Sequence, residues 1–186
     1  MKNTNILPDK YTLEKSYDLK QQNMNFIIQM IFIIIAGIFI GLAFLMKIQL
    51  SSDYSGFITA GITIGLVLIY MSLHELTHGI FISLLSKSKS RYSFNFPFLT
   101  TGTDAYLNKK SFIIVCLAPS VLWGIVLGIS FFFVPNHLML SFYILLGLNF
   151  AGSAGDYLQT IIILKSQKDV LIKDDGSKTN IYNREY

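Results

Sequence analysis

The residues best suited to chemistry lie in one five-residue stretch, His74-Glu75-Leu76-Thr77-His78. On a helix, histidines four residues apart project from one face and can bind a single Zn²⁺ ion through their imidazole nitrogens. The glutamate between them can take a proton from metal-bound water. The pattern therefore predicts His74 and His78 as metal ligands and Glu75 as the catalytic base. The alternative is a buried polar cluster whose hydrogen bonds are satisfied by neighbouring helices.

A catalytic zinc ion usually has three protein ligands and one open position, and Asp156 is the candidate for the third ligand. Glu75 and Asp156 are the only charged residues inside the four long apolar stretches of the chain. Each lies 18 residues from the outer end of its stretch, which is about 27 Å at 1.5 Å per residue. Both carboxylates are therefore expected at one depth. The alternative role for Asp156 is a helix-pairing contact with Thr77 or Tyr157.

Four apolar stretches must position these side chains, and they cover residues 26–46, 57–86, 112–134 and 138–164. Mean hydropathy is +0.52 and 14% of the residues are charged, which excludes a disordered chain. About 20 apolar residues cross a bilayer as a helix, so each stretch is long enough. We predict an all-α membrane protein, in which a four-transmembrane-helix bundle (26–164) lies between an N-terminal segment (1–25) and a C-terminal tail (165–186).

The basic residues predict how this bundle is oriented. Of the 15 Lys and Arg residues, 14 lie in residues 1–25, 87–111 and 165–186, and Lys47 alone lies in the other two connections. Cytoplasmic connections carry the excess of basic residues. We therefore expect a multi-pass protein of the cell membrane with both termini in the cytoplasm. The basic charge is assigned to topology and to contact with the lipid bilayer, and nucleic acid is not an expected partner.

The connection between the second and third stretches contains aromatic residues that alternate with other residues over 91–98, as in a strand. We expect a short cytoplasmic β-like loop whose Phe94 and Phe96 contact an extended substrate peptide. The alternative is an amphipathic strand lying on lipid headgroups. In the fourth stretch, Asn149 lies seven residues before Asp156 and shares its helix face. It either binds a substrate backbone or forms a hydrogen bond between helices.

Together these motifs resemble those of the small bacterial membrane proteins classed as zincin peptidases. The resemblance covers roughly residues 25–183 and rests on 74–79, Ala118-Pro119, 149–156, Asp175-Gly176 and Ile181-Tyr182. The plan is also similar to that of the site-2 intramembrane metalloproteases. Those enzymes typically carry Asn-Pro-Asp-Gly around the third ligand, where this chain has Gly155-Asp156-Tyr157. The resemblance implies zinc as the cofactor, His74, His78 and Asp156 as its ligands, and Glu75 as the base.

The expected function is that of a membrane-embedded zinc metallopeptidase, with Glu75 activating a zinc-bound water. Its expected substrates are peptides, membrane proteins or membrane-proximal proteins. The alternative is a catalytically silent membrane protein with a structural zinc site that binds and regulates a partner. A metal transporter is disfavoured, because no ionisable residues in the apolar stretches continue a path from the site to the outer face.

Overall fold

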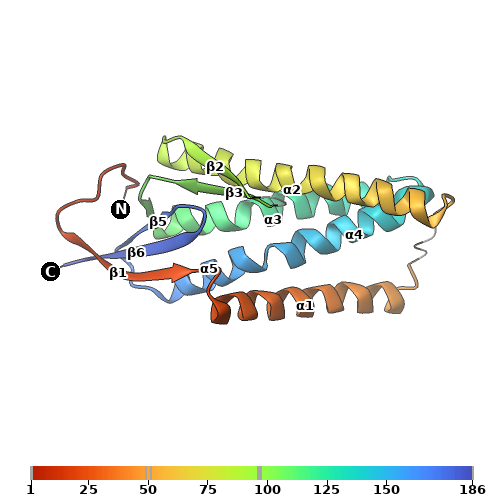
Figure 1. The fold of residues 1–186 in the computed structure, drawn as a ribbon, viewed down its shortest axis with the longest axis horizontal. Coiled ribbons are helices and arrows are strands. Elements are labelled where there is room, and N and C mark those ends of the chain that lie inside the picture. The colour runs from red at the N-terminus through yellow and green to blue at the C-terminus, as the bar shows by residue number, and fades with distance from the viewer. Residues whose placement is uncertain (1, 49, 51, 96–97, 186) are drawn as a thin grey trace.

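The computed structural model describes residues 2–48, 50, 52–95 and 98–185. In this part of the chain, long helices run along the molecule and the strands lie toward the end that holds both termini (Figure 1). The helices are α1 (Gln22–Leu45), α2 (Gly56–Ser86), α3 (Lys109–Phe131), α4 (Asn136–Gly152) and α5 (Ala154–Lys165). The strands are β1 (Tyr11–Asp18), β2 (Ser90–Asn95), β3 (Phe98–Thr103), β4 (Leu107–Asn108), β5 (Val170–Asp174) and β6 (Lys178–Arg184).

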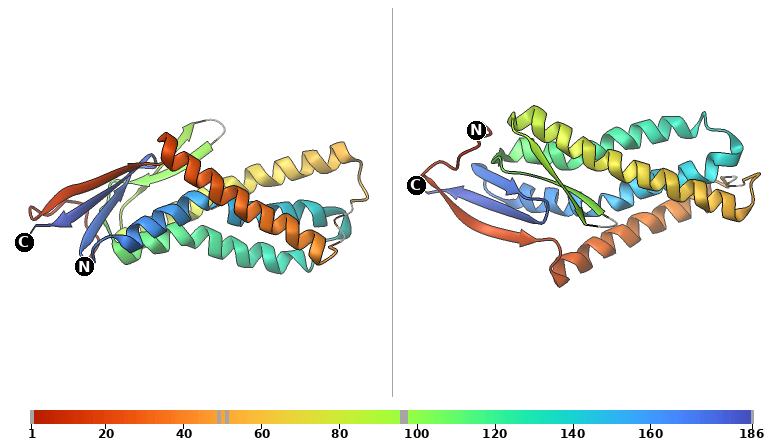
Figure 2. Two further views of the ribbon diagram at one scale, coloured as in Figure 1. Left: turned by 90° about the horizontal axis from the view of Figure 1, so that it is seen from below. Right: turned by 45° about the horizontal axis from the view of Figure 1, so that its top comes forward.

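Among the described residues, four helical spans are long and apolar enough to cross a membrane, namely α1, α2, α3, and α4 together with α5. They correspond to the four predicted stretches, with ends shifted by a few residues. Helix α2 packs against α3 and α4, while α1 runs along α4 and α5 (Figure 2). No described residue of α1 is buried, so many of its large apolar side chains are exposed on the surface of the molecule.

The fourth predicted span is two helices, because α4 ends at Gly152 and α5 begins at Ala154. The break falls in the run Gly152-Ser153-Ala154-Gly155, and Gly/Ser pairs are common sites of helix kinks. The hydroxyl of Ser153 donates a hydrogen bond to the carbonyl oxygen of Asn149 over 2.8 Å. As a result, Asp156 lies in the first turn of α5 rather than in the middle of a long helix.

The prediction of an all-α fold was wrong in one respect, because the mostly helical molecule also contains two antiparallel sheets. Strands from both chain ends form the larger sheet, in the order β1-β6-β5-β4. Its inner residues join α2, α3 and α5 in one apolar core, which consists of Ile82, Leu107, Phe112, Val115, Cys116, Ile163, Val170, Ile172 and Ile181. The sheet requires residues 11–18 to pair with 178–184. Such distant pairing leaves no local signal in the sequence.

The smaller sheet is a hairpin of β2 and β3, which confirms the predicted strand character between the second and third spans. Phe94 lies in β2 opposite Leu99, whereas Phe96 lies outside the described residues. The hairpin packs on α2, and Gly79 makes this close approach possible. A Cβ atom at Gly79 would lie 1.9 Å from the hydroxyl oxygen of Tyr92. The hairpin therefore covers the turn of α2 that carries the histidines.

Candidate metal centre

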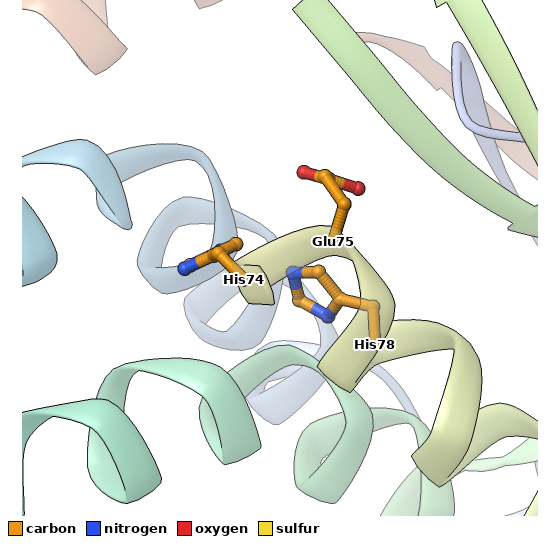
Figure 3. A group of neighbouring side chains, drawn as sticks. All are labelled: His74, Glu75 and His78. Atoms are coloured by element: carbon orange, nitrogen blue, oxygen red, sulfur yellow. The ribbon is translucent and has the colours of Figure 1, made fainter. Parts of the chain in front are cut away.

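Helix α2 supplies three of the candidate side chains from adjacent turns. His74 and His78 lie one turn apart, and their ring centroids are 5.0 Å apart at an interplanar angle of 74°. One ligand atom from each of His74, Glu75 and His78 lies within 4.8 Å of the other two. Figure 3 shows the three side chains leaving consecutive parts of one helix. The helical period of α2 is sufficient to produce this cluster.

Helix α5 brings Asp156 to the same place. Its Oδ2 atom lies 3.4 Å from Nε2 of His74, and its Oδ1 atom lies 3.5 Å from Nε2 of His78. The side chains of His74, His78 and Asp156 are each less than a fifth exposed. The three residues predicted as ligands therefore meet, as their common depth in two separate spans suggested.

The separations between these atoms suit a small tetrahedral cation. Zinc binds nitrogen and oxygen ligands at about 2.0–2.2 Å, so ligand atoms around a tetrahedral ion lie about 3.4 Å apart. The distances from the Asp156 oxygens to the two imidazole nitrogens, 3.4 and 3.5 Å, are of that size. Two neutral imidazoles and one carboxylate also form a ligand set that zinc favours. The side chains present thus fit a zinc ion in chemistry, and these two nitrogen–oxygen separations are compatible with it.

Hydrogen bonds on the far side of each ring leave both Nε2 atoms free to bind a metal. Nδ1 of His78 lies 2.9 Å from the carbonyl oxygen of Val115, which can only accept, so Nδ1 carries the proton. The Tyr70 hydroxyl donates to Oδ1 of Asn149 over 2.8 Å, and its oxygen lies 3.1 Å from Nδ1 of His74. That oxygen therefore accepts from His74. In both rings the Nε2 lone pair faces Asp156, which is the arrangement that metal-binding histidines adopt.

Asn149 forms hydrogen bonds between helices, which is one of the two roles predicted for it. Its side chain is 0% exposed. Its Oδ1 accepts from Tyr70 of α2, and its Nδ2 donates to the carbonyl oxygen of Ser120 in α3 over 2.9 Å. The residue therefore joins three helices and orients Tyr70 behind His74. Tyr70 itself was missed from the sequence, although it precedes His74 by four residues and so lies one turn away on the same face.

We expect Tyr70→Phe to weaken zinc binding by about 10- to 100-fold, the usual effect of removing a residue that orients a metal ligand. The substitution removes the acceptor for Nδ1–H of His74 and leaves Oδ1 of buried Asn149 without its Tyr70 donor. Competition with a chelator of known affinity measures the change. Tyr143→Phe is the matched control, because its hydroxyl donates to the Phe39 carbonyl at a distance from the histidines. Equal zinc affinity in the two variants would contradict the assignment.

Two chambers open beside the cluster, and Glu75 lines both of them. The first, called the sheet-side chamber, has a volume of about 160 Å³. Its lining includes His78, Thr101, Gln159, Asp156 and Asp174. The second, called the apolar chamber, has a volume of about 430 Å³. It is lined by Phe32, Val67, Tyr70, Met71, His74, Glu75, Leu99, Leu148 and Gly152. Empty space therefore adjoins the cluster on two sides, and Glu75 belongs to the wall of both spaces.

Strand β3 runs along the site, held between α2 and the turn that joins β5 to β6. The Thr101 hydroxyl donates to the backbone carbonyl of Glu75 over 2.9 Å. On the other side, a Cβ atom at Gly102 would lie 2.3 Å from the carbonyl carbon of Asp175, so only glycine permits this contact. The turn itself contains Gly176 at φ +86°.

Phe94 of β2, which was predicted to contact a substrate peptide, is 66% exposed and, among the described residues, lines neither chamber. Its contact with substrate or with headgroups stays a prediction.

Asp174 is an acidic residue of the sheet-side chamber that the sequence did not single out. Burial raises its pKa to about 6, although hydrogen bonds from the Gly176 amide and the Thr179 hydroxyl act in the opposite direction. The Gln159 amide also donates to it over 3.0 Å. These contacts engage its carboxylate within and beside the sheet. No local signal in the sequence distinguishes this aspartate from exposed ones.

The central part of the chain matches a known family of proteins. A family model described as "Putative zincin peptidase" matches residues 66–171, which is more than half of the chain. The matched segment begins in α2 before His74 and ends in β5. It therefore contains the His74, Glu75 and His78 cluster, and also Asp156. Neither the curated proteins nor the solved structures gave a match.

Proposed function

Because the chain belongs to the putative zincin peptidase family, we propose that it is a membrane-embedded zinc metallopeptidase. Its substrates are proposed to be membrane or membrane-proximal proteins. One observation carries the proposal: the Nε2 atoms of His74 and His78 converge on the carboxylate of Asp156 at 3.4 and 3.5 Å. These three side chains would hold the ion, and Glu75 lies beside them with a carboxylate that can exchange protons.

Each residue has a distinct role in the proposed hydrolysis. A bound zinc ion would supply Lewis acidity, which polarises a peptide carbonyl and makes water more acidic. The Glu75 carboxylate accepts the proton of the attacking water and passes it to the leaving amine. Tyr70 and the carbonyl of Val115 orient the two imidazoles. Asn149 acts through Tyr70 and not on the substrate.

The two chambers favour a catalytic site over the structural zinc site of the alternative function. Structural zinc sites are closed by four protein ligands, whereas catalytic sites have three and keep one position open. Here three side chains converge, and the fourth candidate, Glu75, lines both chambers. Glu75 is thus shared by the proposed metal site and by both chambers, which supports its assignment as the base rather than as a fourth ligand.

Strand β3 offers a way to bind an extended peptide. Within the described residues β3 pairs with β2 along one edge, and its residues Leu99 and Thr101 line the two chambers beside Glu75. A peptide that adds to the other edge would gain backbone hydrogen bonds. It would also be unwound, as cleavage of a helical segment requires.

The first test of the proposal is the metal content of the purified protein. We expect one zinc ion per chain in detergent, measured by elemental analysis, because the imidazoles of His74 and His78 both face the carboxylate of Asp156. A His74→Ala, His78→Ala double variant should retain almost none. A His137→Ala variant is the control, since His137 lies at the start of α4, away from the cluster. Unchanged zinc in the double variant would refute this metal site.

We also propose that the end of the molecule with the four-stranded sheet lies in the cytoplasm. Both termini and the β2–β3 hairpin lie toward that end (Figure 1). Of the 15 basic residues, 14 lie in residues 1–25, 87–111 and 165–186, which include these segments. In a Cys116→Ser background, an impermeant maleimide added to intact cells should label Ser55→Cys and not Ser93→Cys. Permeabilised cells should show both labels. Labelling of Ser93→Cys alone in intact cells would reverse the orientation.

A further inference from the structure

The apolar chamber lies directly against the metal position. It shares His74 and Glu75 with the cluster, and the rest of its wall comes from α1, α2, α4 and β3. Tyr70, His74 and Glu75 are the polar side chains of its lining, and the other side chains are apolar. At about 430 Å³, its volume falls in the range of small-molecule binding sites. A cavity of this kind favours an apolar occupant that ends at the metal.

The two chambers differ in what they would accept. The sheet-side chamber is smaller and contains the polar side chains of Thr101, Gln159 and Asp174. The apolar chamber is larger and contains Val67, Met71 and Leu148. Strand β3 passes from one chamber to the other, with Leu99 in the apolar chamber and Thr100 in the sheet-side chamber. A peptide lying beside β3 would therefore meet different environments on the two sides of its scissile bond.

We propose that the apolar chamber binds a large apolar side chain of the substrate residue next to the scissile bond, and that Gly152 sets the size of that side chain. This inference rests on the proposed peptidase function. Gly152 lines the chamber, and a Cβ atom built on it meets no described atom within 4 Å. A side chain at this position would meet open space. Because residue 152 forms part of the chamber wall, we expect a large side chain there to reduce the space left for the substrate.

Binding of two hydroxamates to the zinc-loaded protein tests this subsite without requiring a known substrate. Hydroxamates chelate zinc, so acetohydroxamate reports access to the metal, while phenylpropionohydroxamate adds a large apolar group. Titration calorimetry in detergent should show about 10- to 100-fold tighter binding of the second compound, as expected for burial of one large apolar side chain. Gly152→Leu should lose most of this gain and retain its affinity for acetohydroxamate.

Two further variants make the result specific. Gly128→Leu is the matched control, because Gly128 in α3 also has no described atom near its Cβ position and lines neither chamber. It should bind both compounds as the unmodified protein does. Val67→Phe fills the chamber from α2 and should reproduce the effect of Gly152→Leu, so the test does not depend on one variant folding. Zinc content verifies each protein before titration.

The possible results separate this inference from the function beneath it. If acetohydroxamate does not bind the zinc-loaded protein, the zinc ion has no free coordination position. The proposed catalytic site is then wrong, and the proposed subsite is wrong as well. If acetohydroxamate binds but the phenyl group adds no affinity, the subsite is overturned and the peptidase proposal stands. A gain that survives in both Gly152→Leu and Val67→Phe would place the apolar group outside the chamber, and would also overturn the inference.

Discussion

Replacing Glu75 with Gln should lower the rate of peptide hydrolysis by about 10²- to 10⁴-fold, the usual effect of losing a general base. The amide is nearly isosteric with the carboxylate but cannot accept the proton of the attacking water. Zinc should remain, because the ligands are assigned to His74, His78 and Asp156. The measurement compares fragments of membrane proteins in cells that express the unmodified protein or Glu75→Gln at matched levels.

A control variant and the zinc content decide how this experiment is interpreted. Glu14→Gln makes the same chemical change in β1, far along the chain from the cluster, and should leave the fragments unchanged. Zinc analysis of purified Glu75→Gln shows whether its metal site is intact. Full function in Glu75→Gln with zinc retained would contradict the peptidase proposal. It would favour the alternative, a structural zinc site in a protein that regulates a partner by binding it.

Replacing Asp156 with Asn should weaken zinc binding by more than about 100-fold. Residues that only orient a ligand change metal affinity by about 10- to 100-fold, so a ligand that also carries the compensating negative charge should contribute more. Asp156 faces both Nε2 atoms. Its loss leaves two neutral imidazoles and Glu75, the carboxylate assigned as the base, to hold a divalent ion. Chelator competition gives the affinity, and fragment production should fall in parallel.

Asp174→Asn is the matched control for this change. Asp174 lines the same chamber as Asp156, but its carboxylate accepts hydrogen bonds from Gln159, Gly176 and Thr179 within and beside the sheet. This variant should therefore bind zinc as the unmodified protein does. If Asp174→Asn lost zinc and Asp156→Asn retained it, the third ligand would have been assigned to the wrong carboxylate.

Much of the candidate site followed from local rules. A helical period places residues 74 and 78 on one face, so the two histidines meet wherever α2 forms. A carboxylate in an apolar span requires a partner, which made Asp156 the natural companion of these histidines. Counting residues from the outer ends of two spans was sufficient to predict that Glu75 and Asp156 lie at one depth. In the structure, the Asp156 oxygens lie within 3.5 Å of the Nε2 atoms of His74 and His78.

Other parts of the site depended on contacts that no short window of sequence contains. The hydrogen bonds that orient His74 join Tyr70 to Asn149, 79 residues away, and Asn149 to Ser120. The break at Ser153 sets the direction from which Asp156 approaches, although the run of small residues could have suggested it. The sheet-side chamber is lined by Gly102 and by residues of the β5–β6 turn, which pack closely against each other. That contact joins the C-terminal strands to a hairpin about 70 residues earlier in the chain.

The sequence by itself determined the four apolar spans and the spacing that brings His74, Glu75 and His78 together. The cytoplasmic position of both termini stays a prediction from the basic residues. The spans and the spacing depend only on residue type and on the period of a single helix. The tertiary structure alone decided that both chain ends join in one sheet, that Asn149 supports Tyr70, and that an apolar chamber lies beside Glu75. Those features are set by pairing and packing between distant segments, which many different local sequences can satisfy equally well.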